Sequence, residues 1–417
     1  MKKWCLSLLM ACCLILILFS GCQQSSGPKA PKSTKDNGEP LTLYCGSEGS
    51  ANIIEQIVEA YNRRAEPTDQ LEIIPYAGDE GAAITTELIS GKGPDLFFFS
   101  PIALGQLYPI MDKGLFQDLD YYFEKNGISL ENYNQNIINA GVYEGRRMYI
   151  PCWYYTGFFL TTESKLRQFG IPSDISINNM DCSNLLPYLD AISAQGMTLF
   201  NMPPGIEFLV SKFVDYNKKT TAFSSEEFKT MAEQQKLLRS ASGGQGSSDC
   251  VFTYGLTLGG LQGILAYMAE NPLPDDKYLL IPETTLDGSE MAYLNNGSVA
   301  INSNSPNGER AFKFVEWLIS EQTQSDTTII SNGVNSIHKA AFQTRIDQTM
   351  ALSQQEQEIV RQYCSLSEAI TSTCNIDIAF HSEIFYPLWS DYLDDKLTLE
   401  EFVSQLDSKA NLYFKER

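Results

Sequence analysis

Three groups of aromatic residues are the side chains of this sequence best suited to hold a small molecule. They are residues 97–99 (FFF) just before Ser100, residues 153–155 (WYY), and Phe252 with Tyr254. Aromatic rings stack on the apolar faces of sugar rings, and tyrosine hydroxyls form hydrogen bonds with sugar hydroxyls. The three groups therefore predict a pocket for a carbohydrate.

The alternative is that these aromatic residues belong to a hydrophobic core. We expect this for Phe97 and Phe98, which lie in the apolar run 96–99. Such a run is typical of a strand that is covered on both faces. Residues 153–155 cannot all face one core, so we expect at least one of them to line a cleft.

Motifs of catalysis and of cofactor binding give little support to an enzyme. The sequence lacks G-x-S-x-G and H-E-x-x-H, and residues 90–93 (SGKG) do not complete a P-loop. The two histidines, His338 and His381, exclude a poly-histidine metal site. We expect no cofactor and no metal, although 51 acidic residues leave room for the carboxylate pair of a glycosidase.

The charge balance excludes other classes of partner. The 417 residues include 51 acidic and 30 basic ones, which gives a formal net charge of −21. Nucleic acids and anionic membrane surfaces are bound through clustered Lys and Arg, so both are excluded. The acidity argues mildly against an anionic solute and favours a neutral one.

The first residues have the pattern of a bacterial lipoprotein signal. A charged start precedes the apolar run 6–19, which is short for a membrane-spanning helix. Residues 19–22 (FSGC) resemble a lipobox, in which Cys22 accepts the lipid. The alternative is an ordinary secretory signal or a short anchor in which Cys22 is incidental. We expect a signal peptide over residues 1–21 and a lipidated, flexible tether over residues 22–40.

Six cysteines remain in the body of the protein, and none of them has C-x-x-C spacing. An even number outside the cell permits disulfides, with Cys364 and Cys374 as the nearest pair in sequence. The alternative is six buried thiols that act as small hydrophobic residues, and both remain open. The six are Cys45, Cys152, Cys182, Cys250, Cys364 and Cys374.

The hydrophobic pattern predicts the elements that must position these residues. Strands are expected at 41–45, 71–76 and 96–99, with helices between them, which is the alternation of an α/β parallel sheet. Further strands are expected at 278–281 and 297–302. Ser305 and Pro306 are expected to start the next helix as N-cap and first residue, and Thr398 with Glu401 predicts a capping box in a mostly helical C-terminal third.

Four segments resemble one known family when taken in order. Residues 91–97 (GKGPDLF) resemble a G-x-x-P-D strand entry, and residues 143–151 a D-G-K-x-Y-x-x-P hairpin with two substitutions. Residues 300–314 resemble a strand-to-helix return, and residues 398–401 the start of a final helix. The chain thereby resembles extracellular solute-binding protein family 1 of ABC importers, which includes maltodextrin-binding and other sugar-binding proteins.

The resemblance implies an α/β, two-lobed periplasmic-binding-protein fold of type 2, in which crossing segments form a hinge. Lobe 1 would comprise residues 41–150 and 297–335, and lobe 2 residues 151–296 and 336–417. The crossing segments would be residues 151–156, 294–297 and 333–336. The resemblance also implies that substrate-binding residues lie between the lobes: Ser47, Glu48, Phe99, Ser100, Trp153, Tyr155, Glu207, Phe208, Tyr254, Asn295 and Asn296.

The expected protein is a monomeric, lipid-anchored substrate-binding protein and not an enzyme. It would bind a small solute, with a carbohydrate favoured, and deliver it to the membrane subunits of an ABC permease. It would face the outside of the cell membrane, or the periplasm if the host has an outer membrane. Two alternatives remain open: a surface-anchored enzyme that degrades glycans, and a sensory solute receptor without a transport role.

Overall fold

The computed structural model describes the body of the protein in several ranges. Within them, only the backbone is described for residues 48–52, 75, 80–83, 207–208, 290–293 and 374. The expected signal peptide, Cys22 and the tether as far as residue 38 lie outside these ranges, as does Cys182. The ranges are residues 39–45, 48–75, 80–102, 104–105, 107–172, 184–202, 206–242, 249–255, 260–282, 290–294, 297–331, 333–349, 353–374 and 377–416.

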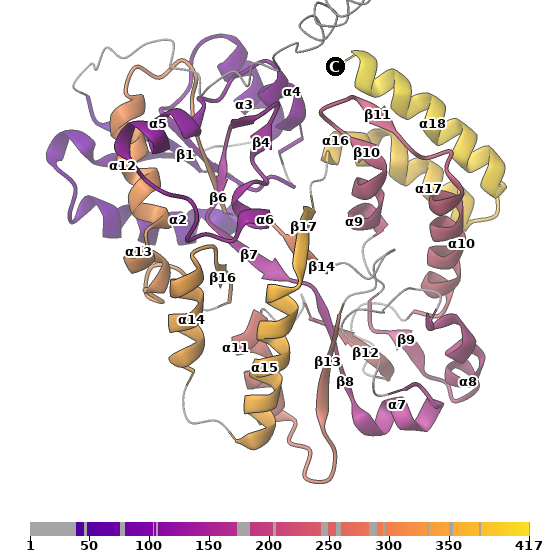
Figure 1. Ribbon diagram of the computed structural model, residues 1–417. Coiled ribbons are helices and arrows are strands. Elements are labelled where there is room, and N and C mark those ends of the chain that lie inside the picture. The colour runs from indigo at the N-terminus through magenta and orange to yellow at the C-terminus, as the bar shows by residue number, and fades with distance from the viewer. Residues whose placement is uncertain are drawn as a thin grey trace, which may run out of the picture.

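A five-stranded sheet forms the centre of the first lobe (Figure 1). The strand order is β2 (Leu71–Pro75), β1 (Leu41–Cys45), β3 (Leu96–Phe99), β15 (Ser298–Ile301) and β6 (Ile150–Pro151). β1 is parallel to both β2 and β3, as the sequence predicted. β15 returns late in the chain and runs antiparallel to β3 and β6.

Side chains of β3 alternate between two hydrophobic cores because successive residues of a strand point to opposite faces. Leu96 and Phe98 pack with α2 (Glu48–Asn62) and α12 (Gly308–Ile319) on one face. Phe97 and Phe99 pack with α3 (Glu80–Ile89) and α4 (Leu107–Asp112) on the other. The prediction that Phe97 and Phe98 are core residues is confirmed. The remaining elements of this lobe are η1 (Pro67–Asp69), α5 (Leu119–Asn126), α6 (Gln135–Ile138), β4 (Val142–Tyr143), β5 (Arg146–Arg147) and α13 (Glu321–Ser325).

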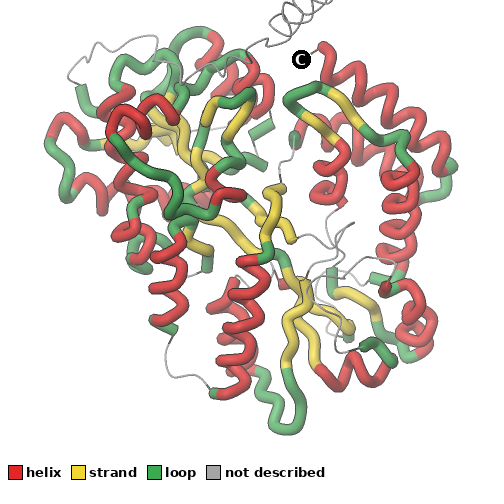
Figure 2. The backbone as a smooth tube through the Cα atoms, viewed as in Figure 1, coloured by secondary structure: helices red, strands yellow, loops and turns green. Residues whose placement is uncertain are grey.

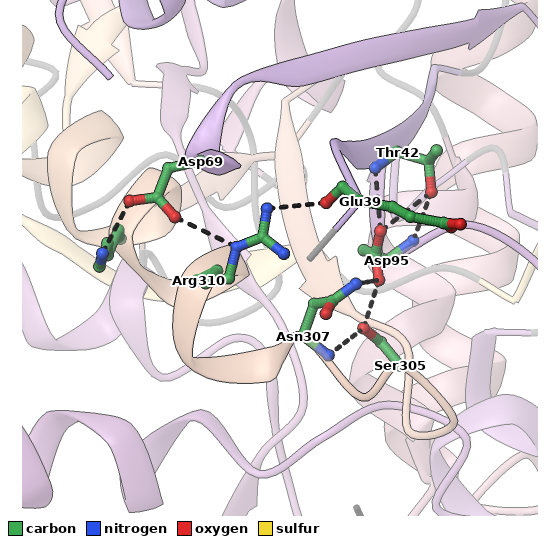
Figure 3. A network of polar contacts seen from close by, with 8 residues as sticks. Glu39, Thr42, Asp69, Asp95, Ser305, Asn307 and Arg310 are labelled. Atoms are coloured by element: carbon green, nitrogen blue, oxygen red, sulfur yellow. Dashed lines mark hydrogen bonds and ion pairs between the residues drawn. The ribbon is translucent and has the colours of Figure 1, made fainter. Parts of the chain in front are cut away.

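The amino end of β3 is held by the buried carboxylate of Asp95, which is only 8% exposed (Figure 3). Asp95 accepts hydrogen bonds from the backbone and hydroxyl of Thr42 at 2.9 and 3.1 Å. It also accepts from the Ser305 hydroxyl at 2.5 Å and from the Asn307 amide at 3.0 Å. One carboxylate thus joins β1, β3 and the segment that leads from β15 into α12. This explains the acid of the G-x-x-P-D motif as a structural residue.

Ser305 is therefore not the cap of the following helix. The structure starts α12 at Gly308, with Asn307 as N-cap and no side-chain cap hydrogen bond. The predicted N-cap at Ser305 was wrong: its hydroxyl donates to the buried Asp95 and accepts from the Asn307 N–H at 3.0 Å, and Asn307 precedes the first residue of α12. The predicted capping box of the last helix is confirmed, since Thr398 and Glu401 exchange the expected hydrogen bonds.

A four-stranded sheet links the lobes. Its strand order is β16 (Asn335–Ser336), β7 (Trp153–Thr156), β14 (Glu290–Tyr293) and β17 (Ile370–Cys374). β7 and β16 lie in the first and third predicted crossing segments, and β14 ends directly before the second. β17 was not predicted, because the C-terminal third was expected to be helical.

A second four-stranded sheet forms the centre of the other lobe. Its order is β13 (Tyr278–Pro282), β8 (Phe158–Thr162), β12 (Cys250–Tyr254) and β9 (Thr198–Phe200). β8 is antiparallel to β12 and β13, and β9 is parallel to β12. The helical elements around this sheet are α7 (Glu163–Phe169), η3 (Leu186–Tyr188), α8 (Leu189–Ala194), α11 (Gly260–Glu270), α14 (Lys339–Asp347) and α15 (Gln354–Glu368).

A further group of helices packs around its own aromatic core and is named the C-terminal cluster. These helices are the red tubes at the upper right of Figure 2. Rings from residues far apart in sequence meet in this cluster, for example Phe228 and Phe402 at 6.0 Å between centroids. It consists of α9 (Ile206–Val210), η4 (Ser211–Phe213), β10 (Val214–Asp215), β11 (Thr220–Thr221), α10 (Glu226–Ser240), α16 (Ile378–Phe380), η6 (His381–Phe385), α17 (Tyr386–Leu393) and α18 (Leu399–Glu416).

The described cysteines favour the alternative in which the thiols are free and act as small hydrophobic residues. Cys152, Cys250 and Cys364 are free, and the first two are buried. Burial raises the pKa of the Cys152 thiol well above its usual range, so this thiol is inert. The pairing of Cys364 with Cys374 was wrong: Cys364 lies within α15 and has no disulfide partner in the structure.

Replacing Asp95 tests the role of its carboxylate. In Asp95→Asn an amide N–H group faces hydrogen-bond donors, so we expect the free energy of unfolding to fall by roughly 2–4 kcal/mol. Urea unfolding followed by tryptophan fluorescence measures the change. In the matched control Asp394→Asn the side chain is 55% exposed, and a change within about 0.5 kcal/mol is expected. Equal losses in the two variants would contradict the assigned role.

Candidate functional site

The carboxyl ends of strands in both lobes meet at the hinge. In the first lobe Pro151 of β6 pairs with Ser298, which in turn pairs with Phe99 at the carboxyl end of β3. In the second lobe Phe158, at the amino end of β8, pairs with Pro282 at the carboxyl end of β13. Because β7 connects β6 to β8, these two sheet edges adjoin the same hinge. In α/β sheets, ligands bind at the carboxyl ends of strands, so this junction is the candidate site.

Many of the connections that leave these strand ends lie outside the described residues. Ser47, Asn295 and Asn296 are among them, and for Glu48, Glu207 and Phe208 only the helical backbone is described. Their assignment as substrate-binding residues remains a prediction. Glu48 begins α2 directly after β1, and Glu207 and Phe208 lie in α9 after β9, so all three belong to elements that follow carboxyl strand ends.

Four of the predicted site residues are buried in the structure. Phe99 packs between Phe116 and Tyr149, at 5.8 and 5.6 Å between ring centroids. Tyr254 packs against Phe159 at 5.6 Å. The exposed fractions of these and the two others are 2% for Phe99, 5% for Ser100, 2% for Trp153 and 3% for Tyr254. The three aromatic rings belong to hydrophobic cores in this structure.

Trp153 fills the space that a glycine leaves open at the hinge. A Cβ atom at Gly297 would lie 2.1 Å from Trp153 Cε2, so only glycine fits there. The indole also packs against Phe98 at 5.6 Å between centroids. Trp153 thus couples the first and second crossing segments.

Tyr155 is the one residue of the trio 153–155 that is half-buried, since Trp153 and Tyr154 are buried. Strand alternation places it on the face of β7 opposite to Tyr154. Tyr154 lines a cavity of about 440 Å³ with Asn134, Ser336 and Phe342. Burial raises the pKa of Tyr155, so its hydroxyl stays protonated and can donate a hydrogen bond. Tyr155 is therefore the least buried member of the trio, although it also packs against the core that contains Trp153.

A second connection joins the lobes away from the hinge. Tyr108 of α4 stacks on Tyr216, which follows β10, with 3.5 Å between centroids and 3° between planes. Asp112 accepts hydrogen bonds from Tyr143 and from Lys219 of the C-terminal cluster, both at 3.1 Å. We call these contacts, with the 3.1 Å hydrogen bond from the Glu144 N–H to Asn217, the clasp.

The clasp was missed by the sequence analysis for a physical reason. Its stacked tyrosines are separated by about a hundred residues, and no local sequence pattern indicates that two tyrosines so far apart are in contact. The clasp connects the first lobe directly to the C-terminal cluster. On the cluster side, Tyr216 accepts a hydrogen bond from the Asp377 N–H at 3.2 Å and packs edge-on against Phe414.

The described residues include no group of three or more His, Cys, Asp or Glu side chains that could hold a metal ion. His338 caps α14, and burial lowers its pKa. His381 is buried among aromatic rings of the C-terminal cluster. Within the described ranges, the structure has no helix long and apolar enough to span a membrane.

Comparison with known proteins identifies the fold. No family model matches the chain, and no curated protein matches it. Solved structures do match it over most of its length. The sugar-binding protein MalE from Xanthomonas citri has a TM-score of 0.67 at 12% identity, over 91% of this chain and 98% of that one.

Two further solved structures agree with this result. Extracellular solute-binding protein family 1 from Alicyclobacillus acidocaldarius has a TM-score of 0.61 at 13% identity, over 90% of this chain and 98% of that one. An ABC substrate-binding protein from Listeria monocytogenes in complex with cycloalternan has a TM-score of 0.62 at 14% identity, over 90% and 99%. The chain has the two-lobed periplasmic-binding-protein fold, as the resemblance implied.

Removing one ring of the clasp should open the protein. A stacked aromatic pair contributes about 0.5–1.5 kcal/mol, so Tyr108→Ala is expected to shift the ratio of open to closed molecules about two- to tenfold. Small-angle X-ray scattering of the solute-free protein should show a larger radius of gyration. Tyr108→Phe keeps the stacked ring, so its radius should lie nearer that of the unmodified protein than that of Tyr108→Ala. An unchanged radius in Tyr108→Ala would show that the clasp does not hold the lobes.

Proposed function

We propose that this protein is an extracellular receptor that binds a small carbohydrate between its two lobes and passes it to an ABC permease. The observation that carries the proposal is the meeting of carboxyl strand ends from both sheets at one four-stranded hinge. A solute held there contacts both lobes at once. It therefore binds the closed arrangement more tightly than the open one and shifts the population toward it.

The carbohydrate assignment is supported by the aromatic residues at this junction and by the solutes named for similar structures. Tyr155 offers a half-buried ring with a protonated hydroxyl, which suits one apolar sugar face and one sugar hydroxyl. Two of the similar proteins are named for sugar or cycloalternan. The proposal assigns no catalytic step to this chain.

Attachment to the membrane is proposed from the amino-terminal sequence. Residues 19–22 (FSGC) offer the Cys22 thiol for lipidation, and residues 23–40 lack large apolar side chains. Two acyl chains at Cys22 suffice for stable anchoring. The anchored receptor would stay near the permease subunits that take over the solute.

Calorimetry of the purified body against a panel of mono- and oligosaccharides tests the carbohydrate assignment. We expect saturable binding of at least one sugar. A response to other small solutes and silence across the whole panel would refute the sugar assignment while leaving solute binding intact.

Tyr155 should contribute to that affinity. Tyr155→Ala removes the stacking ring, and we expect the Kd for the bound sugar to rise about tenfold, which corresponds to ~1.4 kcal/mol. Tyr155→Phe keeps the ring and should lose less. The same titrations measure both variants. If the alanine variant binds with unchanged affinity, Tyr155 does not contact the solute.

Lipidation of Cys22 is tested in cells. Cys22→Ala should abolish incorporation of an alkyne-labelled fatty acid and release the body from the membrane fraction. The matched control is Cys13→Ala, in the same amino-terminal segment, which should remain labelled and membrane-bound. Continued labelling of the Cys22 variant would contradict the lipoprotein assignment.

A further inference from the structure

Arg345 is a buried cation without a counter-charge among the described residues. It lies in α14 and is 9% exposed. Its Nη2 donates a hydrogen bond to the Ser331 carbonyl, whereas its Nη1 is buried and has no hydrogen-bond partner among the described residues. No carboxylate of the described residues forms an ion pair with the guanidinium, and the only nearby ionisable group that affects it is Tyr363.

A buried guanidinium without an opposite charge is unfavourable unless an anion binds to it. Burial lowers the pKa of Arg345 to about 10, which still leaves the group charged at neutral pH. Buried charges in proteins are normally paired, because removing an ion from water is costly when no opposite charge replaces the solvent. The unpartnered Nη1 is the position where an anion would restore the missing hydrogen bond.

The neighbouring groups add further affinity for an anion. The first residue of the 11-residue helix α11 is Gly260, where a Cβ atom would lie 2.7 Å from the Gly333 carbonyl oxygen and 3.7 Å from the Tyr363 hydroxyl. The amino end of a helix carries unsatisfied N–H groups and a partial positive charge. α11 follows the carboxyl end of β12, so its amino end belongs to the ligand-facing edge of the second sheet.

Hydrogen bonds connect Tyr363 to the strands of the hinge. Tyr363 donates a hydrogen bond to Asn335 of β16 at 2.9 Å, and Asn335 donates to Thr156 of β7 at 2.9 Å. A ligand at Arg345 would therefore bind beside the strands on which the lobes turn. We propose that Arg345 and the amino end of α11, which both lie near Tyr363, form a binding site for a small carboxylate, carried by the solute or free in solution.

Assignment of the carboxylate to the solute rests on the proposed function, whereas the anion site itself does not. In the first case the guest is an acidic sugar such as a uronic acid. This reverses the expectation of a neutral solute from the net charge of −21. A local cation and a helix end act at contact distance, whereas the surface charge is screened beyond about 10 Å at moderate salt.

The test is thermal unfolding of the unmodified body and of Arg345→Gln in HEPES with added sodium acetate, sodium glucuronate, glucose or sodium chloride. For the unmodified protein we expect a saturable rise of the midpoint with a carboxylate that exceeds the effect of chloride. Arg345→Gln should lose this rise. Without carboxylate it should unfold at no lower temperature than the unmodified protein, because it removes an unpaired buried charge. The matched control Arg361→Gln alters an exposed arginine of α15 that pairs with Glu358, and it should keep the rise.

The pattern of responses separates the two sources of the carboxylate. A larger rise with glucuronate than with acetate supports a carboxylate on the solute, and equal rises support a free carboxylate. Equal shifts in the unmodified protein and Arg345→Gln, or no shift beyond that of chloride, would overturn the proposal. If Arg345→Gln does not fold, the titration of the unmodified protein still decides, since absence of a saturable response refutes the site. A protein that responds to acetate but to no sugar keeps the site and refutes the carbohydrate assignment.

Discussion

The buried carboxylate of Asp95 is the constraint on which the first lobe depends. A carboxylate that is 8% exposed must have its lone pairs satisfied, and here β1, Ser305 and Asn307 supply the donors. The neighbouring Asp69 accepts from Arg310 and Lys313 of α12, at 3.2 and 2.7 Å (Figure 3). Together these contacts fix the amino ends of the strands to the helix that follows the late strand β15. The carboxyl ends of the same strands lead into the connections that face the hinge. The sheet is therefore fixed at one edge and carries the candidate site at the opposite edge.

At the hinge, the buried side chain of Gln324 connects chain segments in the way that Asp95 does in the first lobe. Gln324 is fully buried, and its amide donates to the Cys152 carbonyl at 3.0 Å while accepting from Ser336 at 2.9 Å. It thus connects the first and third crossing segments, and Trp153 packed over Gly297 connects the first and second. Three chain passages that are remote in sequence are held as one unit. Such a unit allows the lobes to rotate as bodies without separating the strands that join them.

The parts of the fold that depend on local pattern could be predicted from the sequence. The order β1, α2, β2, α3, β3 follows from hydrophobic periodicity, and the capping box at Thr398 follows from side-chain chemistry within four residues. The start of α12 could not be predicted in this way, because the Ser305 hydroxyl binds the distant Asp95 as well as the Asn307 N–H, and the helix begins only at Gly308. In the candidate site, the aromatic residues were found but their orientation was not. Whether Trp153 or Tyr155 faces a ligand is decided by the space above Gly297, which lies far along the chain. Arg345 could not be identified as a site residue from the sequence, because only the structure shows that its guanidinium is buried without an ion pair among the described residues.

The clasp has a consequence for the kinetics of solute capture. The lobes are joined at the hinge and again through Tyr108 and Tyr216, so the proposed binding of a solute between them would require the stacked rings to separate first. Separation of the rings is a unimolecular step that does not depend on solute concentration. The observed association rate would therefore rise with concentration at first and then reach a plateau set by the opening rate. The rate of solute uptake by the proposed receptor would then have an upper limit set by the opening of the clasp, whatever the solute concentration.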